Sequence, residues 1–305
     1  METLELEGPI VCIAGPTASG KTDYAIRVAR TVNGEIVNAD ALQVYADLSV
    51  LSARPSNDEM QDVPHHLFGH VDGRTAYSTG AWVRDARPVL QDISERGRVP
   101  VIVGGTGLYF QALLDGLADI PDVPEALQIA LDATDVAELR EEAERIDPDA
   151  AARILGDDPQ RLARLVGVHR ATGRTLSQWR ADTRPAIRAE PLRRAVLLPD
   201  RDRLYARINA RFDGMIAAGA IDEAAAVRAK DYPARSPMLK AIGLSHLLSY
   251  LDGDCDLADA VKTAKRDTRR LAKRQMTWFR NRCGDWPMLV TQDDRDAFLH
   301  SLKGF

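Results

Sequence analysis

Five short apolar runs alternate along the chain with longer segments of helical periodicity. Continuous runs of this kind, rich in Val, Ile and Leu, predict strands that are buried on both faces. The strands predicted around these runs are Ile10–Ala14, Glu35–Asn38, Val99–Val103, Ala195–Leu198 and Met288–Val290. Because strands that alternate with helices form βα units, we expect an α/β fold with a mostly parallel sheet flanked by helices.

The helical segments between these runs include three long ones. The first begins at Ser78 and ends before Gly97, a residue type common at helix C-termini. The second, from Arg201 to Lys230, has a break near Gly219. The third, Ala258–Arg282, is predicted to be one long basic helix near the end of the chain.

The segment from about Gly116 to Glu190 has no convincing strand pattern. Short helical stretches are separated there by proline-containing turns at Pro121, Pro124, Asp147–Pro148 and Asp157–Pro159. We therefore expect an all-helical insertion, residues 116–190, in an α/β core formed by residues 1–115 and 191–305.

Composition adds limits on the class of protein. The chain has 305 residues, 45% of them hydrophobic, which is enough for a large core. It lacks an apolar run long enough for a transmembrane helix, and residues 1–7 are acidic where a signal peptide is basic. The three cysteines are far apart and odd in number, which favours a reducing cytoplasm. Adjacent histidines such as His65 and His66 rarely bind one metal together, so we expect no histidine metal site.

The formal net charge of −5 does not by itself suggest a nucleic-acid-binding protein, but its distribution does. Residues 115–149 contain twelve acidic residues and only two arginines. Residues 262–282 contain nine Lys or Arg and a single acidic residue, Asp267. This asymmetry indicates that the two segments have different roles.

The residues after the first predicted strand match the phosphate-binding pattern G-x-x-x-x-G-K-[ST]. They lie between that strand and a helical segment that begins at Asp23, which is the context of a P-loop. Glycines let backbone N–H groups curl around an anion, Lys21 and the helix N-terminus add positive charge, and the Thr22 hydroxyl suits Mg²⁺. A glycine-rich turn without a ligand is the alternative. The predicted diphosphate-binding residues are Gly15, Thr17, Ala18, Ser19, Gly20, Lys21 and Thr22, with Mg²⁺ as cofactor on Thr22.

Two further polar residues follow predicted strands. Asp40 comes just after Glu35–Asn38, and Thr106 follows Val99–Val103 within Gly104–Gly107. Residues past the carboxyl ends of parallel strands line the ligand crevice. An Asp40 carboxylate near bound phosphates would be repelled unless it binds Mg²⁺ or transfers a proton. The alternative for Asp40 is a solvated loop residue, and the alternative for Gly104–Gly107 is a plain tight turn. Since Val99–Val103 runs into glycine instead of an Mg²⁺-binding Asp, a conventional nucleotide hydrolase is disfavoured.

Basic residues are grouped on two predicted helices. One face of the first helix carries Arg203, Arg207 and Arg211, which are spaced by four residues. This face is either solvated or carries an arginine that reaches the phosphate site. The long basic helix ends with the aromatic pair Trp278 and Phe279. Cations followed by aromatic rings suit the phosphates and unstacked bases of RNA, although these rings can equally anchor the helix in the core.

In combination, these segments resemble the tRNA dimethylallyltransferase family over nearly the whole chain. The individual motifs are weak, but their order and spacing are specific. They are Gly15–Thr22, Asp40–Tyr45, Pro64–Leu67, Gly97–Tyr109, Asp158–Arg164, Ala241–Gly243 and Lys273–Arg280.

The resemblance implies transfer of a dimethylallyl group from dimethylallyl diphosphate to N6 of adenosine 37, next to the tRNA anticodon. Lys21, Arg211 and Mg²⁺ bound by Thr22 would stabilise the departing diphosphate. Asp40 would act as general base toward the amine, and Thr106 would line the channel where the substrates meet. The adenine would have to leave its stack to reach that channel.

The same resemblance implies which residues contact tRNA, at the anticodon stem-loop. They are Asp40, Ala41, Leu42, Gln43, Gln160, Arg161, Leu162, Ala163, Arg164, Lys273, Arg274, Gln275, Met276, Thr277, Trp278, Phe279 and Arg280. The helical insertion would thus be a tRNA-contacting domain. We expect no membrane association, no obligate protein partner and a monomer.

The chain departs from the family pattern at four places, all outside the phosphate loop, Asp40 and Thr106. Ala41 stands where the family usually has Ser, and Leu51–Pro55 replaces Gly-Thr-Ala-Lys-Pro. Leu244–Ser245 follows Gly243 in place of Tyr and a polar or basic residue, and Pro124–Gln128 lacks an Arg. These differences bear on the affinity for tRNA and on the choice of tRNA.

Three other functions share parts of this pattern. A P-loop small-molecule kinase would use the same phosphate loop but not the basic helix. A prenyltransferase that acts on free adenine nucleotides would need neither the insertion nor that helix. An RNA-binding protein with a relic phosphate loop would not need Lys21, Thr22 and Asp40 together.

Overall fold

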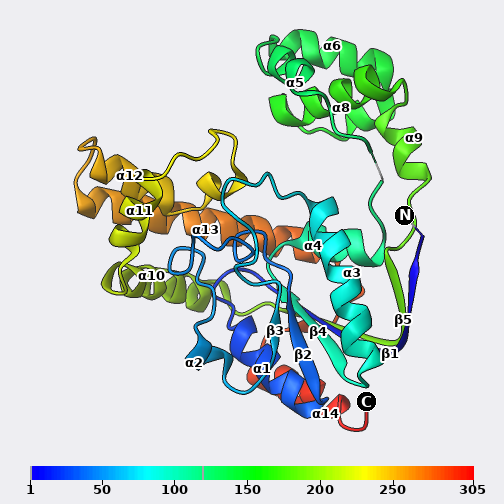
Figure 1. Ribbon diagram of the computed structural model, residues 1–305, viewed down its shortest axis with the longest axis vertical. Helices are drawn as coiled ribbons and strands as arrows, with labels where there is room; N and C mark the ends of the chain where they lie inside the picture. Colours follow the sequence, from blue (N-terminus) through cyan, green and yellow to red (C-terminus); the bar gives the residue numbers. More distant parts are fainter. Residues whose placement is uncertain (1, 119) are drawn as a thin grey trace. The chain divides into compact units, whose positions relative to one another are not determined.

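The computed structural model describes residues 2–118 and 120–305. Within these residues six parallel strands form one sheet, in the order β3-β2-β4-β1-β5-β6 (Figure 1). Their bounds are β1 Leu4–Ala14, β2 Gly34–Asn38, β3 His65–His66, β4 Val99–Gly104, β5 Ile187–Leu197 and β6 Met288–Leu289. The predicted class, a mostly parallel α/β sheet flanked by helices, is confirmed.

The central strands are buried, as their apolar sequences predict. Every residue of β2 and β4 is buried, as are the last five of β1. Alternate side chains of β1 and β4, among them Val11 and Val101, pack in one core cluster with α1 (Lys21–Thr31) and α14 (Gln292–Ser301). The helix α3 (Thr79–Glu95) also packs against β1, β2 and β4. The sheet therefore presents the carboxyl ends of its strands between covering helices.

β1 and β5 begin six and eight residues before their predicted starts, and β3 was not predicted. β1 begins at Leu4 because Leu4–Glu7 pairs with Ile187–Glu190 of β5, and the register shifts between Glu7 and Ile10. These extensions are only partly buried, so they lack the continuous apolar run on which the prediction rested. β3 has two residues, His65 and His66, too few to form a pattern.

The helices of the α/β core lie close to their predicted positions. Ser78 caps α3, whose bounds match the prediction. Gly219, at φ 95°, separates α10 (Arg201–Ala217) from α11 (Ala220–Arg228), and α13 spans Leu257–Arg282. The remaining core helices are α2 Asn57–Met60, the 3₁₀ helix η1 Pro237–Lys240 and α12 Leu244–Leu251. The helix α4, Gly107–Leu114, begins in the core and its last three residues belong to the smaller of two compact units.

The chain divides into two compact units. The larger contains residues 4–111 and 187–305. The described part of the smaller contains residues 2–3, 112–118 and 120–186. The bounds predicted for the insertion, 116 and 190, each lie four residues later in the chain than 112 and 186. Its helices are α5 Glu125–Asp132, α6 Val136–Ile146, α7 Pro148–Ala152, α8 Pro159–Thr172 and α9 Leu176–Ala181.

The smaller unit has its own core, which includes Leu131, Leu139 and Leu165. The proline-containing turns predicted from the sequence start two of its helices. Asp147 caps α7 and Asp158 caps α8, each followed by proline in the first helical turn. Proline is tolerated there because the first N–H groups of a helix have no partner within the helix.

Candidate active site

The phosphate loop, residues 15–20, joins β1 to α1. A Cβ atom on Gly15 would lie 2.8 Å from the carbonyl oxygen of Leu197, so only glycine fits against β5. Ala18 and Gly20 have φ angles of 62° and 83°, which turn the chain into α1 at Lys21. Gly20 is the N-cap of α1 and provides no side-chain acceptor for the first N–H groups of the helix. These groups form the donor set that an anion binds.

Lys21 lies buried at the start of α1. Only 9% of it is exposed, and its Nζ donates to the Pro16 carbonyl at 3.3 Å. Burial lowers the pKa of Lys21 to about 8; the Asp40 carboxylate acts in the opposite sense, and Arg211 lowers the pKa further. The loop therefore holds a desolvated cation whose charged form a bound anion would stabilise.

A second cation reaches this site from α10. Arg211 is half-buried, and its guanidinium donates to the Ala53 carbonyl at 3.3 Å. Burial lowers the pKa of Arg211, while the charge of Asp40 raises it. The structure thus brings together Lys21, Asp40 and Arg211, which are far apart in sequence.

Asp40 follows β2 in a turn organised by buried Asn38. The Asn38 side chain accepts from the Asp40 N–H at 2.9 Å and donates to the carbonyls of Asp40 and Leu67 at 3.1 and 3.0 Å. Asp40 Oδ1 in turn accepts from the Leu42 N–H at 3.1 Å. The backbone under Asp40 is therefore held in place. Asn38 was not among the predicted site residues, although an Asx two residues before a strand-end Asp is a turn signal.

Thr106 is linked to the same turn. Its hydroxyl accepts from the Ala41 N–H at 2.9 Å, and its own N–H donates to the Ala39 carbonyl at 3.2 Å. A Cβ atom on Gly104 would lie 2.0 Å from the Ala39 oxygen, so glycine is required where the loops after β2 and β4 meet. Asp40 and Thr106 are thus held together by direct contacts between their loops.

Gln275 of α13 bridges the phosphate loop and the loop after β4. Its Oε1 accepts from the Thr17 N–H at 3.0 Å, and its Nε2 donates to the Gly105 carbonyl at 2.9 Å. Gln275 was predicted only as a tRNA-binding residue. Gln275 is four residues from both Leu271 and Phe279, which puts it on the inward-facing side of α13. This spacing is the feature of the sequence from which an inward-facing role could have been predicted.

These residues surround a cavity of about 250 Å³, which we call the reaction cavity. Its lining includes polar groups of Thr17, Asp40, Thr106, Arg211 and Gln275. It also includes apolar side chains, those of Leu51, Ile208, Phe212, Met215, Ile242 and Leu271. A cavity lined by a cation, hydrogen-bonding groups and hydrocarbon side chains suits a short apolar chain attached to an anionic group.

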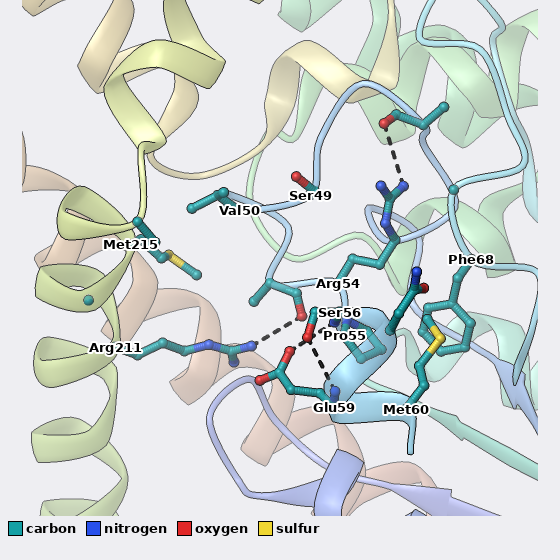
Figure 2. A pocket seen from close by; sticks show the side chains of 16 residues that line it. Ser49, Val50, Arg54, Pro55, Ser56, Glu59, Met60, Phe68, Arg211 and Met215 are labelled. Atoms are coloured by element: carbon teal, nitrogen blue, oxygen red, sulfur yellow. Dashed lines mark hydrogen bonds between the residues drawn. The ribbon is translucent and has the colours of Figure 1, made fainter. Parts of the chain in front are cut away.

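A second cavity, of about 830 Å³, lies beside it and is the pocket drawn in Figure 2. Ala53, Arg211 and Met215 line both cavities. Figure 2 shows Arg211 extending from α10 toward the loop that precedes α2, where it bonds the carbonyl of Ala53. Arg211 and this loop thus form the partition between the two cavities.

The predicted tRNA-binding residues differ in exposure. On α13, Lys273, Arg274, Thr277 and Arg280 are exposed, whereas Met276 and Phe279 are buried. The Phe279 side chain is therefore a core anchor. Trp278 is half-buried against Gly107, where a Cβ atom would lie 2.3 Å from its ring.

The other predicted tRNA-binding segments are divided in the same way. On α8, Leu162 and Ala163 are core residues of the smaller unit, so their side chains do not face solvent. Gln160, Arg161 and Arg164 of that helix are exposed. After β2, Ala41 and Leu42 line the reaction cavity. The Gln43 amide donates to the carbonyls of Ser52 and Ala53 at 3.2 and 2.9 Å. A role of Gln43 in binding bases stays a prediction.

The described residues contain no cluster of three His, Cys, Asp or Glu side chains able to bind a metal ion. His66 instead pairs with Glu35 at 2.7 Å, and His65 bonds the Val63 carbonyl. Thr22, partly exposed in the first turn of α1, offers one hydroxyl beside the phosphate loop. Since Mg²⁺ usually keeps several waters and takes oxygens from a phosphate ligand, one hydroxyl is compatible with it. Across residues 2–118 and 120–305, no helix is long and apolar enough to span a membrane.

Comparison with known proteins gives consistent results along the chain. A family model described as IPP transferase matches residues 43–282, and one described as isopentenyl transferase matches residues 8–68. The tRNA dimethylallyltransferase of Maricaulis maris is 46% identical over 293 residues, covering 95% of each chain. That of Rhizobium etli is 46% identical over 296 residues, covering 95% of this chain and all of its own.

Solved structures agree. A eukaryotic dimethylallyltransferase described as acting on tRNA superposes with a TM-score of 0.78 at 26% identity, covering 89% of this chain and 70% of its own. The tRNA isopentenylpyrophosphate transferase of Bacillus halodurans superposes with a TM-score of 0.67 at 32% identity, covering 97% of this chain and 98% of its own. The chain with this phosphate loop and reaction cavity therefore belongs to the tRNA dimethylallyltransferase family, the IPP transferases.

Proposed function

We propose that this protein transfers a dimethylallyl group from dimethylallyl diphosphate to N6 of adenosine 37, next to the anticodon of tRNA, and releases diphosphate. The observation that carries the proposal is the reaction cavity, in which the phosphate loop, Asp40 and Thr106 adjoin an apolar wall. A nucleotide kinase would not need that wall, because its transferred group is a phosphoryl group. A tRNA substrate is consistent with a cytoplasmic location.

The diphosphate would bind where the phosphate loop and Arg211 border the cavity. The N–H groups of the phosphate loop and the first turn of α1 supply donors, and Lys21 and Arg211 supply positive charge. Lys21 is buried and Arg211 is half-buried, so both would interact strongly with the negative charge that grows on the leaving diphosphate. Mg²⁺ held by the Thr22 hydroxyl and by diphosphate oxygens would offset part of the same charge.

Transfer forms a bond between N6 of the adenine and C1 of the dimethylallyl group, and breaks the bond between C1 and the diphosphate oxygen. The N6 amine loses one proton, which Asp40 accepts as general base. Asp40 suits this role because its Oδ1 is held by the Leu42 N–H and the residue lines the reaction cavity. Thr106, which lines the cavity beside Asp40, would position the adenine.

The tRNA would bind through exposed cations near the cavity. Lys273, Arg274 and Arg280 are exposed on α13, the helix whose Gln275 lines the cavity. Cations in such an arrangement bind the phosphate backbone, and the target base must leave its stack to enter a cavity of this size. Gln160, Arg161 and Arg164 of the smaller unit are exposed candidates for further contacts with the anticodon stem-loop.

Mass spectrometry of unmodified tRNA incubated with the protein, Mg²⁺ and dimethylallyl diphosphate tests the proposal. We expect a five-carbon mass gain that nuclease mapping places on the adenosine next to the anticodon. Parallel reactions with AMP or ATP as acceptor should stay unmodified. Modification of a free nucleotide but of no tRNA would contradict the proposal and identify a nucleotide prenyltransferase.

A further inference from the structure

The loop of residues 48–54, which we call the cavity loop, separates the two cavities. Leu51, Ser52 and Ala53 line the reaction cavity, and Ser49, Val50 and Ala53 line the larger one (Figure 2). Few of its backbone groups are paired by regular secondary structure, since the loop is made of turns. Its conformation therefore depends on contacts with the rest of the larger unit.

One carboxylate holds the N-terminal half of this loop. Glu223 Oε1 accepts hydrogen bonds from the Ser49 N–H at 2.7 Å, the Ser49 hydroxyl at 2.9 Å and the Val50 N–H at 2.9 Å. Its Oε2 accepts from the Leu51 N–H at 2.8 Å. Three successive backbone donors thus meet one anion, and charge-assisted bonds of this kind are stronger than neutral ones.

The C-terminal half of the loop is held by Arg211 of the proposed diphosphate site and by Gln43. The Ala53 carbonyl accepts from Arg211 at 3.3 Å and from the Gln43 amide at 2.9 Å. Ala53 has a φ of 51°, an unfavourable value for a residue other than glycine, so external contacts must maintain it. Arg211 and Glu223 stand on consecutive helices, α10 and α11, on either side of the turn at Gly219.

The loop also places an apolar side chain of the cavity wall. Leu51 is 6% exposed, and it packs with Phe212 around Gly243. A Cβ atom on Gly243 would lie 2.9 Å from the Phe212 ring and 3.1 Å from a methyl carbon of Leu51. Leu51 is the residue whose N–H is bonded to Oε2 of Glu223, so the carboxylate fixes the backbone from which this part of the wall projects.

We propose that Glu223 is a positioning residue for dimethylallyl diphosphate, a role that rests on the function proposed above. Through the cavity loop it places Leu51 against the five-carbon chain and keeps the Ala53 carbonyl where it orients Arg211 toward the diphosphate. Glu223 does not line the reaction cavity and takes no part in the chemistry. Its effect should appear in the binding and selection of the prenyl diphosphate and not in the binding of tRNA.

Glu223→Gln tests this assignment, with Asp222→Asn as its matched control. The new amide nitrogen would face the Leu51 N–H, donor against donor, whereas Asp222 is exposed one residue away on α11. We expect the KM for dimethylallyl diphosphate to rise about tenfold in the Glu223 variant and the KM for tRNA to change less than about twofold. The preference for dimethylallyl over geranyl diphosphate, measured as the ratio of kcat/KM values, should also fall, because a displaced Leu51 no longer limits the chain.

A milder variant, Ser49→Ala, removes one of the four bonds from an exposed side chain and should shift both quantities in the same direction, less strongly. Circular dichroism of each variant establishes that it is folded. The assignment is overturned if folded Glu223→Gln matches Asp222→Asn in KM and in chain-length preference, or if both KM values rise alike. Should the Glu223 variant fail to fold, an unchanged Ser49→Ala variant has the same consequence. A wild-type protein that modifies no tRNA would instead refute the proposed function.

Discussion

Oε1 of Gln275 accepts a hydrogen bond from the backbone N–H of Thr17 at 3.0 Å, which ties α13 to the phosphate loop. The same amide donates to the Gly105 carbonyl at 2.9 Å, next to Thr106. One side chain of the basic helix therefore sets the spacing between the proposed diphosphate site and the loop that faces the adenine. This contact links the loop proposed to bind the diphosphate with the loop proposed to position the adenine.

Gln275→Leu keeps the size of the side chain and removes both bonds. We expect kcat/KM for dimethylallyl diphosphate to fall about tenfold, because the two loops lose their fixed spacing. Steady-state kinetics at saturating tRNA measures this, with the exposed Gln91→Leu of α3 as control. A lower KM in the Gln275 variant would contradict this prediction and mean that the amide competes with the diphosphate for the Thr17 N–H.

Asp40→Asn separates the proposed general base from the structural role of the same side chain. The carbonyl of Asn can still accept from the Leu42 N–H, as Asp40 Oδ1 does at 3.1 Å, but it cannot take the amine proton. We expect single-turnover rates to fall about 100- to 10,000-fold, while the Kd for tRNA stays within about twofold of the wild-type value. The exposed Asp58→Asn of α2 is the control. A wild-type rate in Asp40→Asn would remove Asp40 as the base.

Thr106→Val leaves the Ala41 N–H without its acceptor, whereas Thr106→Ser keeps one. The lost bond is 2.9 Å long and joins the two loops that hold Asp40 and Thr106. We expect Thr106→Val to lower the free energy of unfolding by about 1–3 kcal/mol and to slow transfer, with Thr106→Ser close to wild type in both. Urea unfolding and initial rates measure the two effects. Equal behaviour of the Val and Ser variants would argue against the contact.

The pKa of Lys21, lowered by burial to about 8, predicts how activity depends on pH. The positive charge of this amine is present below pH 8 and is lost as the pH rises through this value, and in the proposed site it is this charge that binds the diphosphate. We therefore expect kcat/KM for dimethylallyl diphosphate to decline above about pH 8, since this parameter reports the free enzyme. Lys21→Arg, whose guanidinium stays charged, should abolish the decline whatever its absolute rate. A flat wild-type profile between about pH 7 and 9 would contradict the prediction.

Glu35 predicts a pH dependence of stability instead of activity. Its side chain is 3% exposed on β2, and hydrogen bonds from Arg96 and His66 lower its pKa from 4.5 to about 2. A lowered carboxyl pKa contributes stability that is present above the unfolded value and is lost as the pH falls toward 2. We expect Glu35→Gln to lower the free energy of unfolding at pH 7 by about 2–3 kcal/mol, and the difference from wild type to shrink below about pH 4. Urea unfolding at several pH values, with exposed Glu95→Gln as control, measures it.

Local features of this protein could be predicted from the sequence because short segments encode them. The strand–loop–helix around Lys21, the caps at Ser78 and Asp158 and the break at Gly219 depend on neighbours within a few residues. The sheet class followed from the order of such segments. The extensions of β1 and β5 were not predicted because they are only partly buried. They form strands by pairing with each other, and no continuous apolar run marks them in the sequence.

Only the tertiary structure decided which distant residues meet. Gln275 forms a hydrogen bond with the Thr17 N–H, and Arg211 forms one with the Ala53 carbonyl. Glu223 accepts hydrogen bonds from three N–H groups of the cavity loop. It also decided that Phe279 and Leu162 lie in the core although they belong to motifs with predicted RNA contacts. The physical reason is that hydrogen bonds and burial depend on distance in space, whereas a single sequence records only order along the chain.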